Sequence, residues 1–183
     1  MQNAEIELKF PVDDPALLQS RLPALGFHLD TPRTFEQNTL YDTVSRSLRK
    51  TRQILRIRRY GEVWTLTHKR QQNGDDNASS RYKVRIETET GIEDGPALGT
   101  IFEQLGYTPV FRYEKFRTEW SHTAPISEDV PFELVSDPSE LSLLAPVGHL
   151  VLDETPIGNF AELEGPPNWI DDTLVQLDID PAD

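Results

Sequence analysis

Charged and apolar residues alternate strictly at the start of the chain. In residues 4–10 the charged side chains Glu5, Glu7 and Lys9 fall on one parity, and apolar side chains occupy the other. Successive side chains of a strand point to opposite faces. The pattern therefore predicts a strand that carries two carboxylates and one ammonium group on a single face.

The same alternation predicts seven further strands, at residues 35–42, 54–60, 63–70, 81–90, 109–120, 150–154 and 159–165. Most connections between them are too short for parallel crossovers, which favours antiparallel pairing in one sheet. A sheet of this many strands loses its exposed edges when it closes. The expected fold is α+β, mainly β: an eight-stranded antiparallel closed β-barrel with short flanking helices on the outside.

Apolar stripes and helix-boundary residues predict those helices near residues 15–25, 96–105 and 167–177. The first would begin after Asp14 and Pro15, bury Leu17, Leu18, Leu22 and Leu25, and end at Gly26. Residues 43–51 are expected to form a loop. We expect one domain over residues 1–183, in which the acidic, Pro- and Ser-rich residues 121–146 are an insertion.

Composition excludes several classes of function. The chain has no cysteine, so it has neither a disulfide framework nor a thiolate metal site. It has no apolar run of membrane-spanning length and no signal-peptide pattern at its N-terminus, so we expect a cytoplasmic protein. A net charge of −13 disfavours non-specific binding to nucleic acid or to an anionic membrane. An anionic ligand must therefore be held by local basic clusters.

Such clusters lie on the charged parities of the predicted strands. These positions hold nine of the 18 basic residues: Lys9, Arg56, Arg58, Lys69, Arg81, Lys83, Arg85, Lys115 and Arg117. For one strand, the ordinary interpretation is a solvated outer face. For the whole set, charged outer faces would put the apolar faces inside the barrel and leave the amphipathic helices no apolar surface to cover. We therefore predict that the charged faces point inward.

A charged interior is costly unless its groups are compensated, and a bound polyanion with a divalent metal would compensate them. Arg and Lys suit phosphate oxygens, whereas carboxylates suit Mg²⁺ or Mn²⁺ shared with phosphate. Two carboxylates at i and i+2 of a strand can reach one cation. Such acidic pairs, with Asp153 near the last of them, are Glu5 and Glu7, Glu87 and Glu89, and Glu162 and Glu164.

The ordered motifs resemble those of CYTH-domain proteins, the triphosphate tunnel metalloenzymes. Residues 5–9 (EIELK) are similar to the ExExK signature of that family. Further similar segments follow in order along nearly the whole chain: residues 38–42, 55–58, 66–69, 85–89, 115–117 and 152–165. The resemblance implies an eight-stranded antiparallel tunnel that acts on triphosphates with Mg²⁺ or Mn²⁺.

The resemblance also implies roles for individual residues. The metal-binding set it implies is Glu5, Glu7, Glu87, Glu89, Asp153, Glu162 and Glu164. The triphosphate-binding set is Lys9, Arg56, Arg58, Lys69, Arg85, Lys115 and Arg117. The implied catalytic residues are Glu5, Glu7, Lys69 and Asp153.

Three functions remain open on the sequence alone. The first is metal-dependent hydrolysis of a triphosphate, most economically inorganic triphosphate, with thiamine or nucleoside triphosphates as other substrates. The second is a class IV adenylyl cyclase, which makes cyclic AMP and pyrophosphate from ATP. The third is a non-catalytic polyphosphate- or nucleotide-binding module, which the complete set of carboxylates disfavours. The expected partner is a small-molecule triphosphate, and both a monomer and a homodimer remain open.

Overall fold

A computed structural model describes residues 2–71, 83–123 and 147–179; for residues 2–5, 83 and 84 it describes the backbone alone. The strands are β1 (Gln2–Pro11), β2 (Phe27–Thr43), β3 (Ile54–Tyr60), β4 (Val63–Gln71), β5 (Lys83–Ile92), β6 (Tyr107–His122), β7 (Gly148–Thr155) and β8 (Gly158–Glu164). The helices are α1 (Pro15–Arg21), the 3₁₀ helix η1 (Leu22–Leu25), α2 (Ser47–Lys50), α3 (Gly95–Gln104) and α4 (Pro167–Leu177). No helix in the described ranges is long and apolar enough to cross a bilayer.

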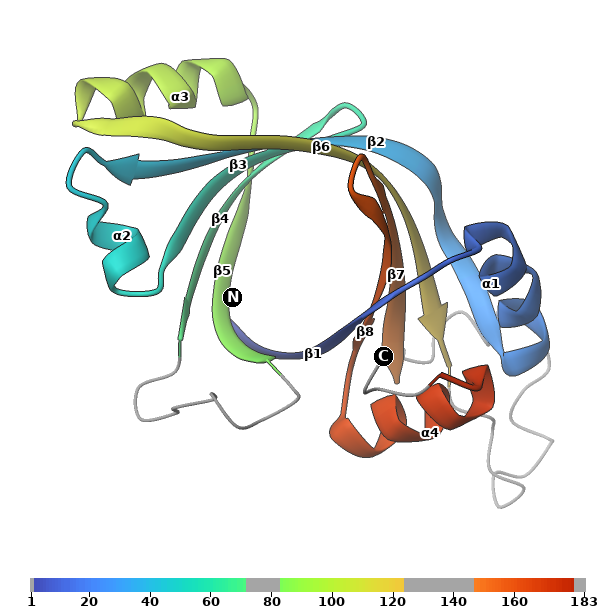
Figure 1. Ribbon diagram of the computed structural model, residues 1–183. Coiled ribbons are helices and arrows are strands. Elements are labelled where there is room, and N and C mark those ends of the chain that lie inside the picture. The colour runs from blue at the N-terminus through green and yellow to red at the C-terminus, as the bar shows by residue number, and fades with distance from the viewer. Residues whose placement is uncertain (1, 72–82, 124–146, 180–183) are drawn as a thin grey trace, which may run out of the picture.

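The strands form one strongly curled antiparallel sheet (Figure 1). Their order is β1-β5-β4-β3-β2-β6-β7-β8, and β8 in turn pairs with β1. Strand β1 divides its length between two partners, because its first half pairs with β5 and its second half with β8. The long strands β2 and β6 run side by side with three register irregularities, which allow the sheet to bend. The predicted mainly β, eight-stranded antiparallel sheet is confirmed.

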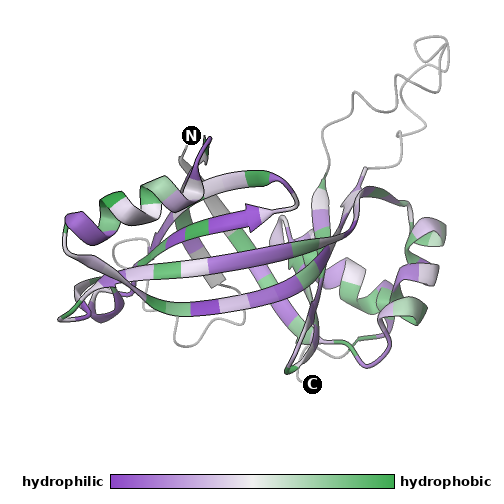
Figure 2. Cartoon of the chain, turned by 90° about the horizontal axis from the view of Figure 1, so that it is seen from above, coloured by the Kyte–Doolittle hydropathy of each residue, from purple (hydrophilic) through white to green (hydrophobic). Residues whose placement is uncertain are grey.

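The apolar side chains of β1, β6, β7 and β8 point away from the inside of the curl. Helices α1 and α4 cover this outer surface (Figure 1), and hydrophobic and hydrophilic positions alternate along the strands (Figure 2). Leu150, Leu152 and Leu163 are fully buried there, and burial of each such side chain contributes about 1.5–3 kcal/mol. The main apolar core therefore lies between the sheet and its helices, outside the curl.

The first helix begins and ends as the sequence predicts, but it buries one leucine fewer. The Asp14 carboxylate accepts hydrogen bonds from the backbone N–H groups of the first turn, and Gly26 ends the segment with a φ of +85°. Leu18 and Leu22 are buried, whereas Leu17 is 60% exposed, so its predicted burial is wrong. Leu18 and Leu22 are four residues apart and share one face of the helix, whereas Leu17 lies about 100° around the helix from Leu18 and so points away from that face.

Helix α4 packs closely on the sheet at a glycine. Its residues Trp169, Ile170, Leu174 and Leu177 are buried, as their spacing predicts. A Cβ atom on Gly148 would lie 2.5 Å from the Trp169 ring. Only a glycine at the start of β7 allows the helix to approach this closely.

Three segments differ from the sequence expectation. Strand β2 begins at Phe27 rather than at residue 35. Apolar alternation in its first half is limited to Phe27 and Leu29, and Pro32 interrupts the pattern, so this half is held mainly by pairing with β6. Helix α2 forms within the expected loop, where Asp42 accepts hydrogen bonds from the N–H groups of Leu48 and Arg49. Strand β6 extends to His122, and residues 124–146 of the expected insertion lie outside the described residues.

Candidate active site

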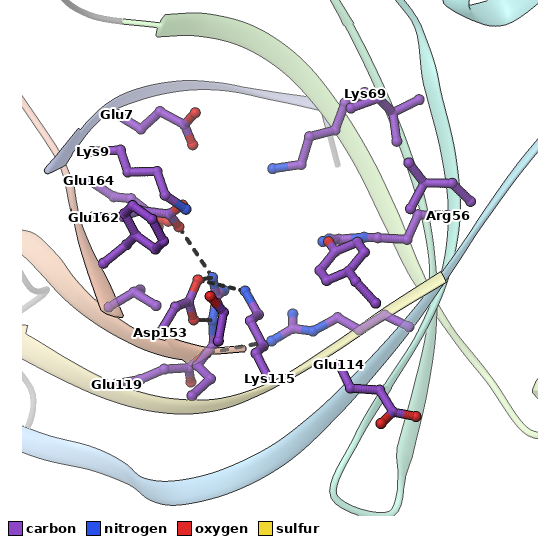
Figure 3. A pocket seen from close by; sticks show the side chains of 18 of the residues that line it. Glu7, Lys9, Arg56, Lys69, Glu114, Lys115, Glu119, Asp153, Glu162 and Glu164 are labelled. Carbon is purple, nitrogen blue, oxygen red and sulfur yellow. Dashed lines mark hydrogen bonds and ion pairs between the residues drawn. The ribbon is translucent and has the colours of Figure 1, made fainter. Parts of the chain in front are cut away.

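The charged strand faces line a cavity of about 1370 Å³ inside the curled sheet, and all eight strands contribute to it. Figure 3 shows Glu7, Glu162 and Glu164 along one wall, with Lys69 and Arg56 extending from the opposite wall. The structure therefore places the charged faces inside, which is the arrangement that the apolar faces and the amphipathic helices predict.

Three carboxylates gather on the first wall. One oxygen each of Glu7, Glu162 and Glu164 lie within 4.8 Å of one another. The antiparallel register explains the grouping, because Glu7 on β1 is paired with Glu164 on β8. We call these three residues the carboxylate group. Several carboxylate oxygens around one point are the donor set that Mg²⁺ and Mn²⁺ prefer, so these residues fit the metal that the sequence predicts. The side chain of Glu5 lies outside the described atoms.

Asp153 lies deeper, between two cations. It is only 1% exposed. Lys115 Nζ donates to its Oδ2 at 2.6 Å, and Arg117 donates through Nε at 2.7 Å and Nη2 at 2.8 Å. Burial by itself would raise the pKa of Asp153, but the hydrogen bonds and charges of Arg117 and Lys115 outweigh burial and lower the pKa to about 2. Both oxygens of Asp153 are therefore engaged with cations of the protein.

The pairing of Asp153 with Lys115 and Arg117, which we call the Asp153 clamp, predicts a pH-dependent stability. The pKa of Asp153 falls from 3.8 to about 2, which corresponds to about 2 kcal/mol. A lowered carboxyl pKa stabilises the fold above the unfolded-state value, and the contribution is lost as the pH falls from about 4 to 2. We expect the free energy of unfolding to change between pH 5 and pH 2 by about 2 kcal/mol less in Asp153→Asn than in the unsubstituted protein. Urea denaturation at each pH measures this, and equal pH slopes would contradict the clamp.

Glu162 joins the carboxylate group to the cations. Lys9 Nζ donates to Glu162 Oε1 at 2.8 Å, and Arg117 Nη2 donates to Oε2 at 3.2 Å. Burial would raise the pKa of Glu162, but the charges of Arg117 and Lys9 outweigh burial and lower the pKa. Lys9 also lies 5.0 Å from the centre of the Phe160 ring. Glu162 is therefore ionised near neutral pH and, as a member of the carboxylate group, pairs with two cations.

The opposite wall combines cations with the other predicted acidic pair. Lys69 Nζ lies 2.8 Å from Glu87 Oε2, and Arg56 Nη2 lies 4.0 Å from Glu87 Oε1. Glu89 accepts a hydrogen bond from Thr67. The structure thus brings Glu87 and Glu89 to the cationic wall rather than to the carboxylate group. Arg85 also lines the cavity. The Nε atom of Arg56 is buried without a hydrogen-bond partner among the described residues.

Glu36 was not predicted as a site residue from the sequence, and it lies beneath three of the predicted phosphate ligands. It is 0% exposed. Its oxygens lie 2.9 Å from Arg58 Nη2, 3.3 Å from Lys115 Nζ and 3.6 Å from Arg117 Nε. The Asn38 side-chain amide donates to it at 2.7 Å. Burial would raise the pKa of Glu36, but the three cations lower it.

A single signal pointed to Glu36, and it was weak. Glu36 occupies the inward parity of a predicted strand, two residues before Asn38. It has no acidic partner at i+2, so a search for metal-binding pairs passes over it. Glu119 was missed for the same reason; it lies 3.6 Å from Arg58 and accepts a hydrogen bond from Thr31.

Comparison with known proteins matches residues 3–167 to the CYTH domain. The chain belongs to the CYTH domain family. CYTH proteins act on triphosphates, as triphosphatases or cyclases. The matching segment covers all eight strands that line the cavity, from the second residue of β1 to the end of β8.

One curated relative is MJ0240 of Methanocaldococcus jannaschii, provisionally named an adenylate cyclase. It is 31% identical over 113 residues, which are 62% of this chain and 61% of the relative. The match thus spans less than two thirds of that relative's length.

Solved structures share the fold at low identity. The PH1012 and PH1819 proteins of Pyrococcus horikoshii OT3 give TM-scores of 0.68 and 0.67 at 16% and 21% identity; each comparison covers 96% of this chain and 91% of the other. HpAC1 from Hippeastrum, provisionally named an adenylyl cyclase and described as having a dominant triphosphatase activity, gives 0.57 at 19% identity, with 96% and 88% coverage.

Proposed function

We propose that this CYTH protein hydrolyses a triphosphate in a closed, charged tunnel with Mg²⁺ or Mn²⁺ as its cofactor. The observation that carries the proposal is the cavity in which the carboxylate group faces a wall containing Arg56 and Lys69 (Figure 3). The pairing of β8 with β1 supports the closed form of the tunnel.

The balance of charges in the cavity supports a metal-bound polyanion. Among the described residues, eight basic and nine acidic side chains line the cavity. A bare polyanion would therefore meet no net positive charge. A divalent cation at the carboxylate group would reverse that balance and leave the Arg and Lys side chains to bind phosphate oxygens. The substrate ligands we propose are those the sequence predicts: Lys9, Arg56, Arg58, Lys69, Arg85, Lys115 and Arg117.

Preorganisation of these cations supports catalysis rather than binding of a triphosphate without turnover. Asp153 and Glu36 fix Arg117 and Lys115 from below. Cations held in this way can stabilise charge that develops on a transferring phosphoryl group without reorganising during the reaction. When bound, the metal would supply charge neutralisation at the phosphoryl oxygens and would orient water. We assign Asp153 to positioning of cations rather than to metal binding, because both its oxygens already accept hydrogen bonds.

Lys69 and Arg56 would bind the substrate from the opposite wall. Their positions across the cavity from the carboxylate group (Figure 3) allow a triphosphate to be held between a metal and two cations. For Lys69, the proposed catalytic role is to stabilise negative charge on the transferring phosphoryl group. Glu87, which lies 2.8 Å from Lys69 Nζ, would orient that ammonium group.

A nucleotide cyclase is the second candidate, favoured by the provisional naming of MJ0240. In that reaction the ribose 3′-hydroxyl attacks the α-phosphate, the bond to the bridging oxygen breaks, and pyrophosphate leaves. The same cations would stabilise either transition state. The two activities therefore differ in their products rather than in the charged part of the cavity.

A product assay separates the candidates. The purified protein is incubated with inorganic triphosphate, thiamine triphosphate and ATP, each with Mg²⁺ and with Mn²⁺, and phosphate, pyrophosphate and cyclic AMP are measured together. We expect metal-dependent release of phosphate without cyclic AMP. Equal amounts of pyrophosphate and cyclic AMP from ATP would establish the cyclase instead. Tight triphosphate binding without any product would support a non-catalytic binding module.

A further inference from the structure

One part of the cavity lining is apolar and aromatic. It consists of Leu40 on β2, Ile54 on β3, and Phe111 and Tyr113 on β6. We call these four residues the aromatic mouth. The rings of Phe111 and Tyr113 lie 5.8 Å apart at an angle of 33°, and Phe111 is 59% exposed. An apolar surface that carries two aromatic rings is thus open to the cavity.

The aromatic mouth adjoins the charged section along three strands. Leu40 is paired with Arg56 on one side and with Phe111 on the other. On β6, Tyr113 and Phe111 precede Lys115 by two and four residues, which places them about 7 and 13 Å along the strand. A group attached to a triphosphate held at Lys115 would reach this surface.

Packing of the protein itself does not account for these side chains. The core cluster of the described residues contains none of the four. On the opposite face of the same strands, Tyr41 packs against Phe102 of α3, so the helix covers the outer surface and leaves the inner one open. Arg112 and Glu114 also line the cavity beside the mouth and offer polar groups at its edge.

We propose that the aromatic mouth binds a planar ring of the substrate, and that the preferred substrate is therefore a ring-bearing organic triphosphate rather than inorganic triphosphate. The inference rests on the proposed function and names the substrate class for it. The size of the cavity agrees: about 1370 Å³ exceeds the roughly 300–1,000 Å³ of a site for a drug-sized ligand. Inorganic triphosphate would occupy the charged section alone.

Substitution of Phe111 tests the aromatic mouth. The quantity measured is the ratio of kcat/KM for an organic triphosphate to kcat/KM for inorganic triphosphate. We expect Phe111→Ala to raise KM for ATP or thiamine triphosphate roughly ten-fold, because stacking on one aromatic ring is lost. The kcat/KM for inorganic triphosphate stays unchanged. Phe111→Tyr should retain the preference, whereas Phe111→Leu, which keeps apolar volume without a flat face, should lose most of it. Of ATP and thiamine triphosphate, the substrate whose KM rises more in Phe111→Ala carries the ring that the aromatic mouth binds.

Phe35→Ala is the matched control. Phe35 is also a partly exposed aromatic residue of the sheet, 42% exposed, but it packs against Phe116 and does not line the cavity. Phe35→Ala should therefore leave the ratio of kcat/KM values between ATP and inorganic triphosphate unchanged. An unsubstituted protein that prefers inorganic triphosphate, or a Phe111→Ala protein with an unchanged ratio, would overturn the inference.

Binding measurements keep this test separate from the proposed hydrolysis. The dissociation constants of β,γ-imido-ATP and of inorganic triphosphate are measured by calorimetry for the same variants. If no substrate turns over but Phe111→Ala weakens only β,γ-imido-ATP, the mouth is correct and the hydrolase proposal is wrong. If substrates are hydrolysed but Phe111→Ala changes neither the kcat/KM ratio nor the ratio of dissociation constants, the proposed role of the aromatic mouth is wrong and the hydrolase proposal stands. Absence of both effects overturns both.

Discussion

Glu7→Gln is expected to lower metal-dependent turnover by at least about 100-fold. Loss of a group that only hydrogen-bonds to a metal ligand already costs about 10–100-fold, and Glu7 belongs to the carboxylate group itself. Glutamine keeps the shape of the side chain but removes its charge. The free energy of unfolding should change by less than about 1 kcal/mol. Initial rates over a range of Mg²⁺ and Mn²⁺ concentrations measure the first effect, and urea denaturation measures the second.

Glu154→Gln is the control for this substitution. Glu154 lies on β7 next to Asp153, but it pairs with Arg33 at 2.8 Å and does not line the cavity. Its loss should leave both turnover and metal dependence unchanged. Calorimetric titration with Mn²⁺ should show weaker binding to Glu7→Gln only. Full activity with an unaltered metal requirement in Glu7→Gln would remove the carboxylate group from the site.

The sequence predicted the fold well because the determinants of the strands are local. A two-residue alternation appears within any one strand, and residues 54–60 were placed as the structure has them. The direction of the charged faces was also accessible, because amphipathic segments such as α4 need an apolar surface to cover. The first half of β2 was not predicted, since it is specified mainly by its pairing with β6.

Grouping of the charged residues was less accessible, because it depends on register between distant segments. Glu87 with Glu89 and Glu162 with Glu164 have the same spacing in the sequence. In the structure, Glu87 is paired with Lys69 on β4, whereas Glu164 is paired with Glu7 on β1. The first pair therefore lies against a cation, and the second completes an acidic cluster. No property of either tripeptide distinguishes these outcomes.

The partners of Glu36 lie on β3 and β6, so its role also depends on register between distant segments. Its substitution should have the largest effect on the free energy of unfolding. Loss of one partner from a buried ionic network costs about 3–5 kcal/mol, because the remaining charges stay buried without compensation. Glu36→Gln leaves Arg58 without its buried carboxylate, while Arg117 and Lys115 keep Asp153. We expect a loss of about 3 kcal/mol in the free energy of unfolding at pH 7, measured by urea denaturation.

The pH dependence and a matched variant separate lost charge from altered packing. The pKa of Glu36 is lowered, so its contribution is present above an ordinary value of 4.5 and is lost as the pH falls below it. The difference between the two proteins should shrink accordingly in acid. Glu119→Gln, which removes a carboxylate only 3.6 Å from Arg58 and partly exposed, should cost less than about 1 kcal/mol.

Ligand rescue of Glu36→Gln then connects the network to the site. The substitution leaves excess positive charge beneath the proposed phosphate ligands, so inorganic triphosphate without metal should stabilise Glu36→Gln more than the unsubstituted protein. Thermal melts at increasing triphosphate concentration measure this difference. Equal stabilisation of both proteins, or a stability loss that stays the same in acid, would mean that Glu36 acts through packing alone. A larger stabilisation of Glu36→Gln would place the buried carboxylate in competition with the substrate for the same cations.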